Sequence, residues 1–393
     1  MAKRVLISGA SVAGPALAYW LGRAGYEVTV VERAPKLREG GYAVDFRGEA
    51  HLGVLRRMGV LDALKALETG GGAMRFVDPK NRTQMSLPAE FAGGELEVRR
   101  ADLSRVLYEA GRDNARYLFG DTVRSLTQHA DRVDVTFEKA APESFDLVVG
   151  ADGIHSNIRR LAFPGQQFER DLGYYIASWD TPGIEACSTE TVCCNVPGRM
   201  IGIQPPGRDG TPPSALALFA SKPLPIGRRD VVRQKEVVRK IFAGMGWHAP
   251  KLLKSLEATD DLYFNTISRA KVPHWSVGRV VLLGDAAGGV SIGGMGTGSA
   301  IVGAYVLAGE LLARPDDHAA AFGRYQSRIE PYAAEGANNG ESSGKFLTPA
   351  SRLGLTLRNA MFSFPPIKRW MIDLAQESGA AIDLPEYDGM AHI

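Results

Sequence analysis

Three short glycine-containing turns, each directly after an apolar strand, constrain the fold of this chain more than any other feature. In such a turn the backbone can approach a phosphate closely, because glycine adds no side chain at the point of contact. We therefore expect an α/β fold in which the chain returns three times to the same dinucleotide. The predicted strands and their turns are Lys3–Ile7 with Gly9–Gly14, Phe145–Val149 with Gly150–Gly153, and Arg279–Leu283 with Gly284–Ala287.

The first turn, Gly9–Gly14 with the sequence GASVAG, has the spacing of a dinucleotide-binding fingerprint. The predicted helix Pro15–Ala24 directs its N–H groups and the positive end of its dipole toward a pyrophosphate. Glu32 ends the next strand, where a carboxylate accepts hydrogen bonds from ribose hydroxyls. Ser11 replaces the usual middle glycine, which weakens the fingerprint. A tight strand-to-helix turn without a ligand is the alternative.

The second turn continues into Asp152–Ser156 and is followed by Arg159 and Arg160. An Asp-Gly pair after a strand is by itself more often a structural turn than a binding site. The two arginines offer a cationic surface for a phosphate, with a solvated helix face as the alternative.

The third turn leads through a glycine-rich run into the predicted helix Thr297–Arg314. Residues 288–296 hold five glycines in nine positions, which is costly in chain entropy and indicates backbone contact with a flat ligand. Asp285 can accept hydrogen bonds from the ribityl side of a flavin, and the helix N-terminus would stabilise negative charge on the reduced ring. A glycine-rich surface loop is the alternative.

The composition argues against several classes of protein. The net charge is only +2, and no basic stripe interleaved with aromatic residues occurs, so we expect no nucleic-acid binding. The three cysteines form no CxxC pair, and we predict neither a disulfide framework nor a metal site. No run of about 18 apolar residues and no signal peptide is evident, so we expect a cytoplasmic protein without a membrane span, as a monomer or homodimer.

The length of 393 residues suggests two domains. Between about 170 and 270, prolines alternate with strand-like runs, which indicates a mostly antiparallel sheet inserted into the α/β domain. The runs are Tyr174–Trp179, Thr191–Val196, Met200–Gln204 and Ser214–Ala220. Further helices are predicted at 50–67, Asp102–Gly111 and Arg229–Gly244.

The segment Ser351–Ala380 is predicted to be mostly helical, with a break at Pro365-Pro366. Its apolar residues share one helix face, which would bridge the two domains and cap a pocket, or only cover an exposed hydrophobic surface. These residues are Leu353, Leu357, Ala360, Met361 and Phe364.

The three turns, in this order and spacing, resemble the FAD-dependent aromatic hydroxylases with the p-hydroxybenzoate hydroxylase fold, over nearly the whole chain. The sequence is most similar to the subgroup of tetracycline-inactivating and polyketide-tailoring flavin monooxygenases. The segments that carry this closer resemblance are Gly9–Leu21, Gly40-Gly41 with Val44–Gly48, Val302–Leu311 and Leu384–Tyr387.

The resemblance implies a Rossmann-like FAD-binding domain of residues 1–73, 100–170 and 272–345. A substrate-binding domain would comprise 74–99 and 171–271, and a bridging helix and tail 346–393. It also implies that FAD is held by Gly9, Ser11, Ala13, Gly14, Glu32, Arg33, Arg47, Arg100, Asp152, Asp285, Gly294, Met295 and Gly296. Candidate contacts to the substrate are Tyr175, Trp179, Met200 and Phe219.

The implied reaction is a hydroxylation of an aromatic or polyketide-type substrate, such as a tetracycline- or anthracycline-like compound. NADPH or NADH would reduce FAD as a transient co-substrate, and O₂ would form a flavin C4a-hydroperoxide that transfers one oxygen. Because the flavin carries this chemistry, we predict no catalytic side chain.

One departure from the family leaves alternatives open. The segment Gly288–Ile292 lacks the usual proline and the aromatic residue or histidine, and it looks one residue short. A flavin dehydrogenase or oxidase on the same fold, or a non-catalytic FAD-containing ligand-binding protein, are therefore the competing interpretations.

Overall fold

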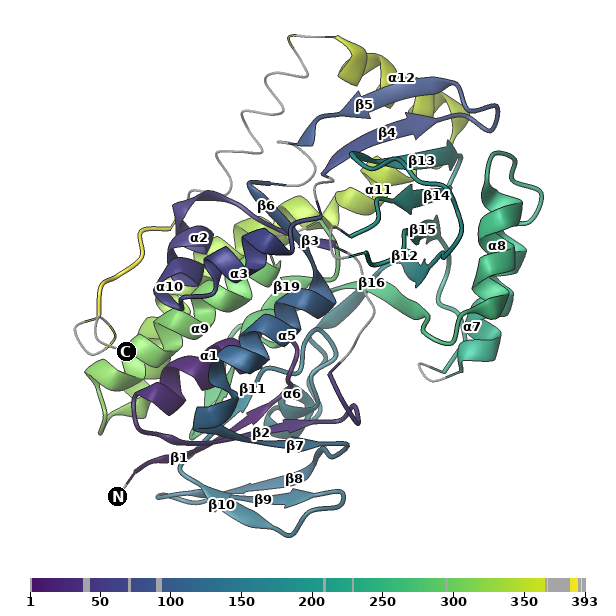
Figure 1. Cartoon of the computed structure of the whole chain (residues 1–393). Coiled ribbons are helices and arrows are strands. Elements are labelled where there is room, and N and C mark those ends of the chain that lie inside the picture. The colour runs from purple at the N-terminus through teal and green to yellow at the C-terminus, as the bar shows by residue number, and fades with distance from the viewer. Residues whose placement is uncertain are drawn as a thin grey trace.

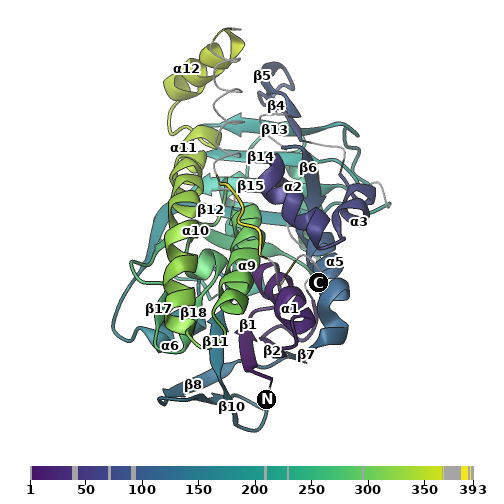
Figure 2. The same cartoon turned by 90° about the vertical axis from the view of Figure 1, so that its left-hand side faces the viewer.

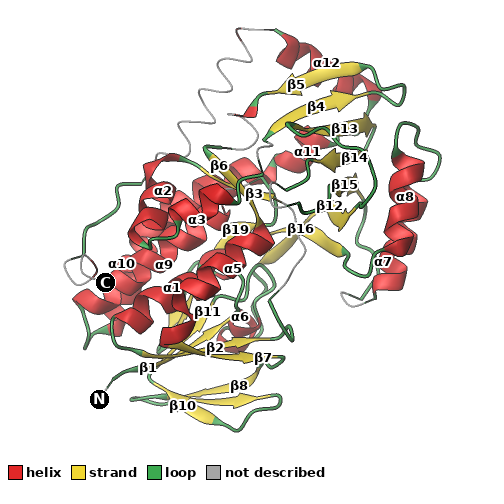
Figure 3. Ribbon diagram, in the orientation of Figure 1, coloured by secondary structure: helices red, strands yellow, loops and turns green. Residues whose placement is uncertain are grey.

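The computed structural model describes residues 2–37, 43–69, 72–89, 94–207, 210–227, 230–293, 296–364, 366, 382–387 and 390 (Figure 1). Two sheets organise this part of the chain. A parallel sheet with its helices occupies the lower part of the view, and a larger, mostly antiparallel sheet occupies the upper right (Figure 3). The mixture of α/β and inserted antiparallel structure confirms the predicted fold class.

The first sheet has the order β17-β18-β11-β1-β2-β7. All neighbours are parallel except β17 and β18, so the turns that follow β18, β11 and β1 lie side by side at one edge. These strands are apolar and buried, as expected of a parallel sheet covered by helices. The strands are β1 (Arg4–Ser8), β2 (Glu27–Glu32), β7 (Ala115–Phe119), β11 (Leu147–Gly150), β17 (Ser276–Val277) and β18 (Val280–Leu282).

Four helices accompany this sheet. The helix α1 packs against both α5 and α9, and α9 packs against α10 (Figure 2). The helix α9 lies in the core on all sides, because every residue from Gly298 to Leu311 is buried. Among the described residues, only α9 has the length and hydropathy of a membrane span, and 78% of it is buried as in a core helix. The four are α1 (Ala13–Arg23), α5 (Arg100–Gly111), α9 (Gly296–Ala313) and α10 (His318–Glu341).

The second sheet has the order β19-β16-β12-β15-β14-β13-β4-β5, with β13 and β4 as its parallel pair. Three of its strands, β13, β14 and β15, follow the predicted runs closely. The sequence did not predict the hairpin β4–β5 or the strand β16. The strands are β4 (Ala73–Val77), β5 (Thr83–Leu87), β12 (Glu169–Asp180), β13 (Glu190–Val196), β14 (Arg199–Gln204), β15 (Ser214–Ala220), β16 (Tyr263–Lys271) and β19 (Gly288–Val290).

Each face of the second sheet has its own core. The helices α7 (Val231–Phe242) and α8 (Ala249–Ala258) cover one face, at the right of Figure 1. The other face packs against α10, α11 (Ser343–Leu347) and α12 (Arg352–Ser363).

Smaller elements accompany the two sheets. The predicted helix at 50–67 is two helices, because Gly59 adopts a positive φ of 70° between them. A two-stranded ribbon, β3–β6, and a three-stranded sheet, β10-β9-β8, complete the fold. The bounds are α2 (Gly48–Arg57), α3 (Leu61–Ala66), α6 (Asn157–Ala162), β3 (Ala43–Phe46), β6 (Leu96–Arg99), β8 (Val123–Gln128), β9 (Val133–Phe137), β10 (Glu143–Phe145), η1 (Arg112–Asn114) and η2 (Gly284–Ala286).

The orientation of α12 corrects the predicted bridging face. Leu353 is 68% exposed and Phe364 57% exposed, so the apolar stripe faces away from the core. Arg358 causes this orientation, because its guanidinium donates to Phe346 O at 3.0 Å and lies 4.7 Å from the ring centroid of Phe76. Among the described residues, this stripe therefore has no bridging contact. Of the predicted continuation to Ala380, residues 365 and 367–380 lie outside the described residues.

Candidate functional site

The three turns are in direct contact at the edge of the parallel sheet. Gly9 adopts a φ of 111°, and a Cβ there would lie 2.4 Å from the Ala151 carbonyl oxygen, so the first turn touches the second. Gly284 adopts a φ of 64°, and a Cβ there would lie 3.5 Å from Ala13 Cβ, so the third turn reaches the first. Only glycine allows the close approach at Gly9, because any side chain would displace the second turn.

The N-terminus of α1 is built to receive an anion. Its N-cap residue, Val12, makes no side-chain capping bond, and no acidic residue lies in the first turn. A Cβ at Gly14 would lie 1.9 Å from the Gly9 carbonyl oxygen, which keeps the turn tight. Arg100, at the start of α5, points its Nε and Nη2 at Ser11 Oγ over 3.4 and 3.3 Å. Unsatisfied N–H groups, a helix dipole and a guanidinium therefore converge, as a pyrophosphate requires.

Glu32 fixes the shape of the first turn. Its two carboxylate oxygens accept hydrogen bonds from the backbone N–H groups of Ala10 at 2.9 Å and Ala34 at 2.8 Å. Each oxygen keeps a further lone pair, so the carboxylate can also accept from ribose hydroxyls. Arg33, the next residue, is exposed.

Asp152 of the second turn has a structural role. Its Oδ2 accepts from the backbone N–H groups of Asn157 at 2.8 Å and Ile158 at 3.0 Å, and its Oδ1 accepts from the Ser156 hydroxyl. Burial raises the pKa of this carboxyl, and the three hydrogen bonds oppose that shift. Asp152 therefore anchors the start of α6.

Arg159 joins the second turn to the third. Its guanidinium is buried and donates to the carbonyl oxygens of Ile154 at 2.6 Å and Ala286 at 3.0 Å. The sequence could not reveal this role, because an arginine on a short helix has the same pattern whether it faces solvent or a distant turn.

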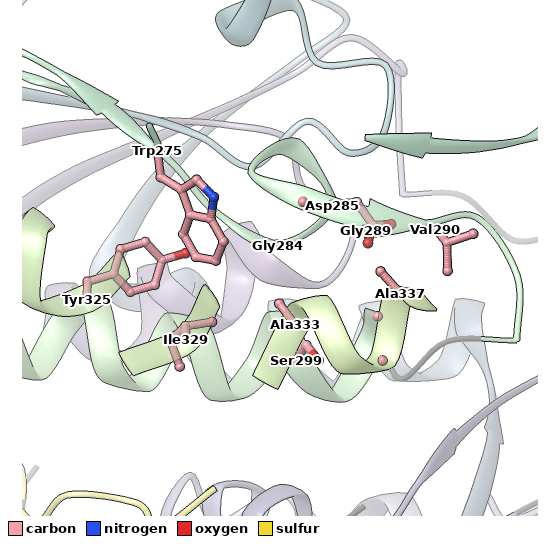
Figure 4. Close-up of a pocket in the computed structure, with 13 residues that line it drawn as sticks. Trp275, Gly284, Asp285, Gly289, Val290, Ser299, Tyr325, Ile329, Ala333 and Ala337 are labelled. Atoms are coloured by element: carbon pink, nitrogen blue, oxygen red, sulfur yellow. The ribbon is translucent and has the colours of Figure 1, made fainter. Parts of the chain in front are cut away.

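Asp285 lies where the third turn meets the start of α9. A Cβ at Gly289 or Gly296 would lie 2.3 or 3.0 Å from Asp285 Oδ1, so both backbones pass directly beside the carboxylate. Burial raises the pKa of Asp285, and the nearby Arg100 opposes the shift. Figure 4 shows Asp285 beside a cavity of about 10 Å³ between α9, α10 and β19, with Ser299 on its wall. Such a cavity has room for about one water molecule.

Arg47 directly precedes α2. Its Nε donates to Asp45 Oδ2 at 2.6 Å, and the side chain is largely buried. Gly296 is the first residue of α9, whereas Gly294 and Met295 lie outside the described residues.

A second, open cleft of about 650 Å³ lies beyond the second turn. Its lining is mainly polar and rich in arginine. Arg33 and Arg124 have no hydrogen bond or ion pair to another residue that the structure describes, whereas Arg160 donates to Asn157. The lining includes Arg33, Arg124, Asn157, Arg159, Arg160 and Gln167.

Three of the predicted substrate contacts, Tyr175, Trp179 and Phe219, lie in the core between the sheet and the helices α7 and α8. Trp179 Nε1 donates to Ser255 Oγ of α8 at 3.1 Å, and Phe219 stacks edge-on against Phe242 of α7. Tyr175 stacks on Phe219 in the same core. All three are buried under α7 and α8, so they offer no surface to a ligand.

Met200 lies on the opposite face, in the core that includes Val290 of β19 and Ala337 of α10. Strand alternation explains the split, because neighbouring residues of a strand point to opposite faces.

The residues present fit FAD. A side chain at Gly9 or Gly14 would clash with the backbone of the neighbouring turn, α1 presents its N-terminus, and Arg100 reaches Ser11. Asp285 of the third turn lies beside the start of α9 and close enough to Arg100 to interact with its charge. These groups together fit an extended dinucleotide that contacts all three turns.

Comparison with known proteins agrees with this geometry. The FAD binding domain family matches residues 2–339. An uncharacterized protein of Mycobacterium tuberculosis is 40% identical over 338 residues, which cover 84% of this chain and 90% of that protein. A flavin-dependent monooxygenase from an unknown prokaryotic organism is 36% identical over 397 residues, covering 98% of this chain and 99% of the relative. The crystal structure of the tetracycline destructase Tet(55) aligns with a TM-score of 0.82 and 34% identity, over 98% of this chain and 99% of that one.

Proposed function

This chain belongs to the FAD binding domain family and is an FAD-dependent monooxygenase, and from that premise we propose that it consumes NADPH or NADH to hydroxylate an aromatic or polyketide-type compound. The observation that carries the proposal is the contact among the three turns at one edge of the parallel sheet. The residues 1–73, 100–170 and 272–345 form the FAD-binding part in this proposal.

The chain would hold FAD from end to end. The N-terminus of α1 and Arg100 bind the pyrophosphate, Glu32 binds the adenosine ribose, and Asp285 accepts from the ribityl hydroxyls. When bound, FAD accepts two electrons from the nicotinamide co-substrate, and the reduced flavin activates O₂ at its C4a position. The N-terminus of α9 stabilises negative charge near the flavin ring, because the positive end of its dipole lies beside the third turn, where Gly296 approaches Asp285.

The arginine-rich cleft supports a reduced nicotinamide dinucleotide as the electron donor. The FAD pyrophosphate belongs at α1, which leaves Arg124 and Arg160 available for the phosphates of a second ligand, whereas Arg33, which lines the same cleft, stays a predicted FAD contact. Guanidinium groups bind phosphate through charge-assisted, paired hydrogen bonds. We assign NADPH or NADH to this cleft as a transient co-substrate.

The substrate would contact the face of the antiparallel sheet that looks toward α10 and α11. Its core includes Ile176, Met200 and Leu218, and the partly exposed Leu216 and Ile292 adjoin that core. Ile292 follows β19, so it comes from the loop that begins at the third turn. An apolar wall of this kind suits a polycyclic aromatic or polyketide compound, which the similarity to a tetracycline destructase also supports.

Two measurements test the proposal. We expect anaerobic NADPH to bleach the visible flavin band, and to bleach it faster when a tetracycline-like polyketide is present. We then expect one oxygen atom from ¹⁸O₂ in the product. Product without ¹⁸O would favour a flavin dehydrogenase or oxidase, and a flavin that NADPH and NADH never reduce would favour a non-catalytic FAD protein.

A further inference from the structure

A fully buried histidine, His51 on α2, links two of the segments that surround the proposed flavin site. Its Nδ1 accepts a hydrogen bond from the Arg47 backbone N–H at 3.0 Å. A backbone N–H can only donate, so Nδ1 carries no proton and the proton of the neutral ring is on Nε2. The Nε2 group is hydrogen-bonded to the hydroxyl of Tyr332 on α10.

The second partner, Tyr332, lies on α10, which packs against α9. Its hydroxyl oxygen accepts from Nε2 of His51. One hydrogen-bonded chain therefore runs from the Arg47 backbone through His51 to Tyr332, which we call the His51 relay.

The ring of His51 also contacts α9 directly. A Cβ at Gly298 would lie only 2.1 Å from His51 Cε1, so the imidazole fits against the bare helix backbone. The rings of Phe46 and Tyr332 both meet the imidazole edge-on, with centroids 6.1 Å away. The relay thus has a single arrangement, because packing and hydrogen bonding restrain the same ring.

The relay begins at a group that the flavin would touch, and its imidazole packs on Gly298, next to a second such group. Arg47 directly precedes α2 and is a predicted FAD contact, and Ser299, which follows Gly298, lines the small cavity that Asp285 also lines (Figure 4). The N-terminus of α9 lies less than one turn before Ser299. A displacement of this turn would change the distance between the helix dipole and the flavin ring, and the dipole effect falls off within about one turn.

We propose that His51 and Tyr332 are positioning residues for the flavin, which hold Arg47 and the first turn of α9 at a fixed separation and so set FAD affinity and reduction potential. This inference rests on the proposed FAD site. The relay requires a neutral imidazole, because a protonated Nδ1 could not accept from the Arg47 N–H. Burial supports that state, since it lowers the pKa of His51 to about 4.

The test uses four variants of the full chain. Tyr332→Phe removes only the hydroxyl, His51→Asn keeps an acceptor near the Nδ1 position, and His51→Leu removes both bonds. Tyr305→Phe is the matched control, because Tyr305 is also a buried tyrosine whose hydroxyl donates to a carbonyl, that of Pro385 at 2.9 Å, away from the relay. Titration of FAD-free protein gives the dissociation constant, and dye equilibration gives the two-electron potential.

We expect His51→Leu to weaken FAD binding at least tenfold and Tyr332→Phe at least threefold, both with a more negative potential than the wild type. We expect His51→Asn to recover part of the affinity relative to His51→Leu. Tyr305→Phe should change affinity by less than twofold and leave the potential unchanged.

Equal affinity and potential for Tyr332→Phe, His51→Asn and Tyr305→Phe would overturn the inference and reduce the relay to ordinary packing. If His51→Leu does not fold, the FAD affinity and potential of Tyr332→Phe and His51→Asn still test the inference. A wild-type protein that binds no FAD would instead contradict the proposed function, so the two failures are distinguishable.

Discussion

The two sheets of this protein present their candidate sites in different ways. At the edge of the parallel sheet, the groups that would face FAD are mainly backbone: glycines in contact, a helix N-terminus and turns held by Glu32 and Arg159. On the antiparallel sheet, the groups that would face the substrate are side chains, and each strand divides them between two cores. A backbone site is fixed by local turn sequence, whereas a side-chain site depends on which face the rest of the fold covers.

The largest effect should come from filling the backbone contact in the first turn. Gly14→Ala places a Cβ 1.9 Å from the Gly9 carbonyl oxygen. We expect loss of FAD binding and a destabilisation of more than about 3 kcal/mol. The measurements are the flavin absorbance of the purified protein and its thermal unfolding.

Gly25→Ala is the control at the other end of α1. Gly25 also has a positive φ, of 86°, but open space surrounds its Cβ position. It should cost about 1 kcal/mol and keep FAD. Equal loss of FAD in both variants would show that backbone contact at the first turn is not what the site depends on.

Substitutions on the two faces of the antiparallel sheet should separate stability from substrate binding. Phe219→Ala should cost about 3–5 kcal/mol, because it empties the core under α7 and α8, and it should leave the KM for the substrate unchanged. Ile292→Ala should raise that KM several-fold with little loss of stability. Urea unfolding and steady-state kinetics measure the two quantities, and a reversal of this pattern would place the substrate on the other face.

The flavin region should also be the more sensitive to acid. His51 has an ordinary pKa of 6.5 when unfolded and about 4 when folded. As the pH falls below 6.5 the unfolded state gains a proton that the folded state refuses, so stability decreases until about pH 4 and then levels off. The full loss is about 3 kcal/mol by linkage.

The comparison between wild type and His51→Leu isolates this contribution. Asp45 and Arg47 are the charged groups that act on His51. Glu97 opposes the trend, because its pKa is raised to about 7 and its stabilisation is lost as the pH rises. The free energy of unfolding should fall less between pH 7.5 and pH 4.5 in His51→Leu than in the wild type. An equal fall in both proteins would refute the assignment of this pH dependence to His51.

These contrasts explain what the sequence could predict. The three turns, α1 and Glu32 were predicted because glycine spacing and strand apolarity are local signals. The sequence could not show that Trp179 and Phe219 lie under α7 and α8, because alternation shows that two faces exist and not which helices cover each one. His51, Tyr332 and Arg159 were missed because their partners are distant in sequence, and no local pattern marks a buried histidine or arginine as part of a site.

Substitutions of two aspartates in the FAD region should separate an effect on FAD binding from an effect on stability. Asp285→Ala should weaken FAD binding about 10- to 100-fold, equivalent to about 1.4–2.8 kcal/mol. Asp152→Ala should cost about 1–2 kcal/mol of stability through lost anchoring of α6, with a smaller effect on FAD. Calorimetric titration and thermal unfolding test the pair, and the opposite ranking would make Asp152 the binding residue.

The smallest expected effect concerns the arginine-rich cleft. Arg124→Gln should raise the KM for NADPH by about threefold to tenfold, in line with one charge-assisted contact of about 1 kcal/mol, and should leave FAD affinity unchanged. Lys240→Gln, on the exposed side of α7, is a control of equal charge change. An unchanged KM in Arg124→Gln would remove this residue from the proposed NAD(P)H site.

The most direct test of the central claim is an equilibrium titration of FAD-free protein with FAD, performed on the wild type, Gly14→Ala and Asp285→Ala. We predict one FAD per chain for the wild type, with binding lost at the first turn and weakened at the third, because one molecule spans both. A wild type that binds no FAD, or affinity that neither substitution reduces, would contradict the claim that the three turns share one flavin nucleotide.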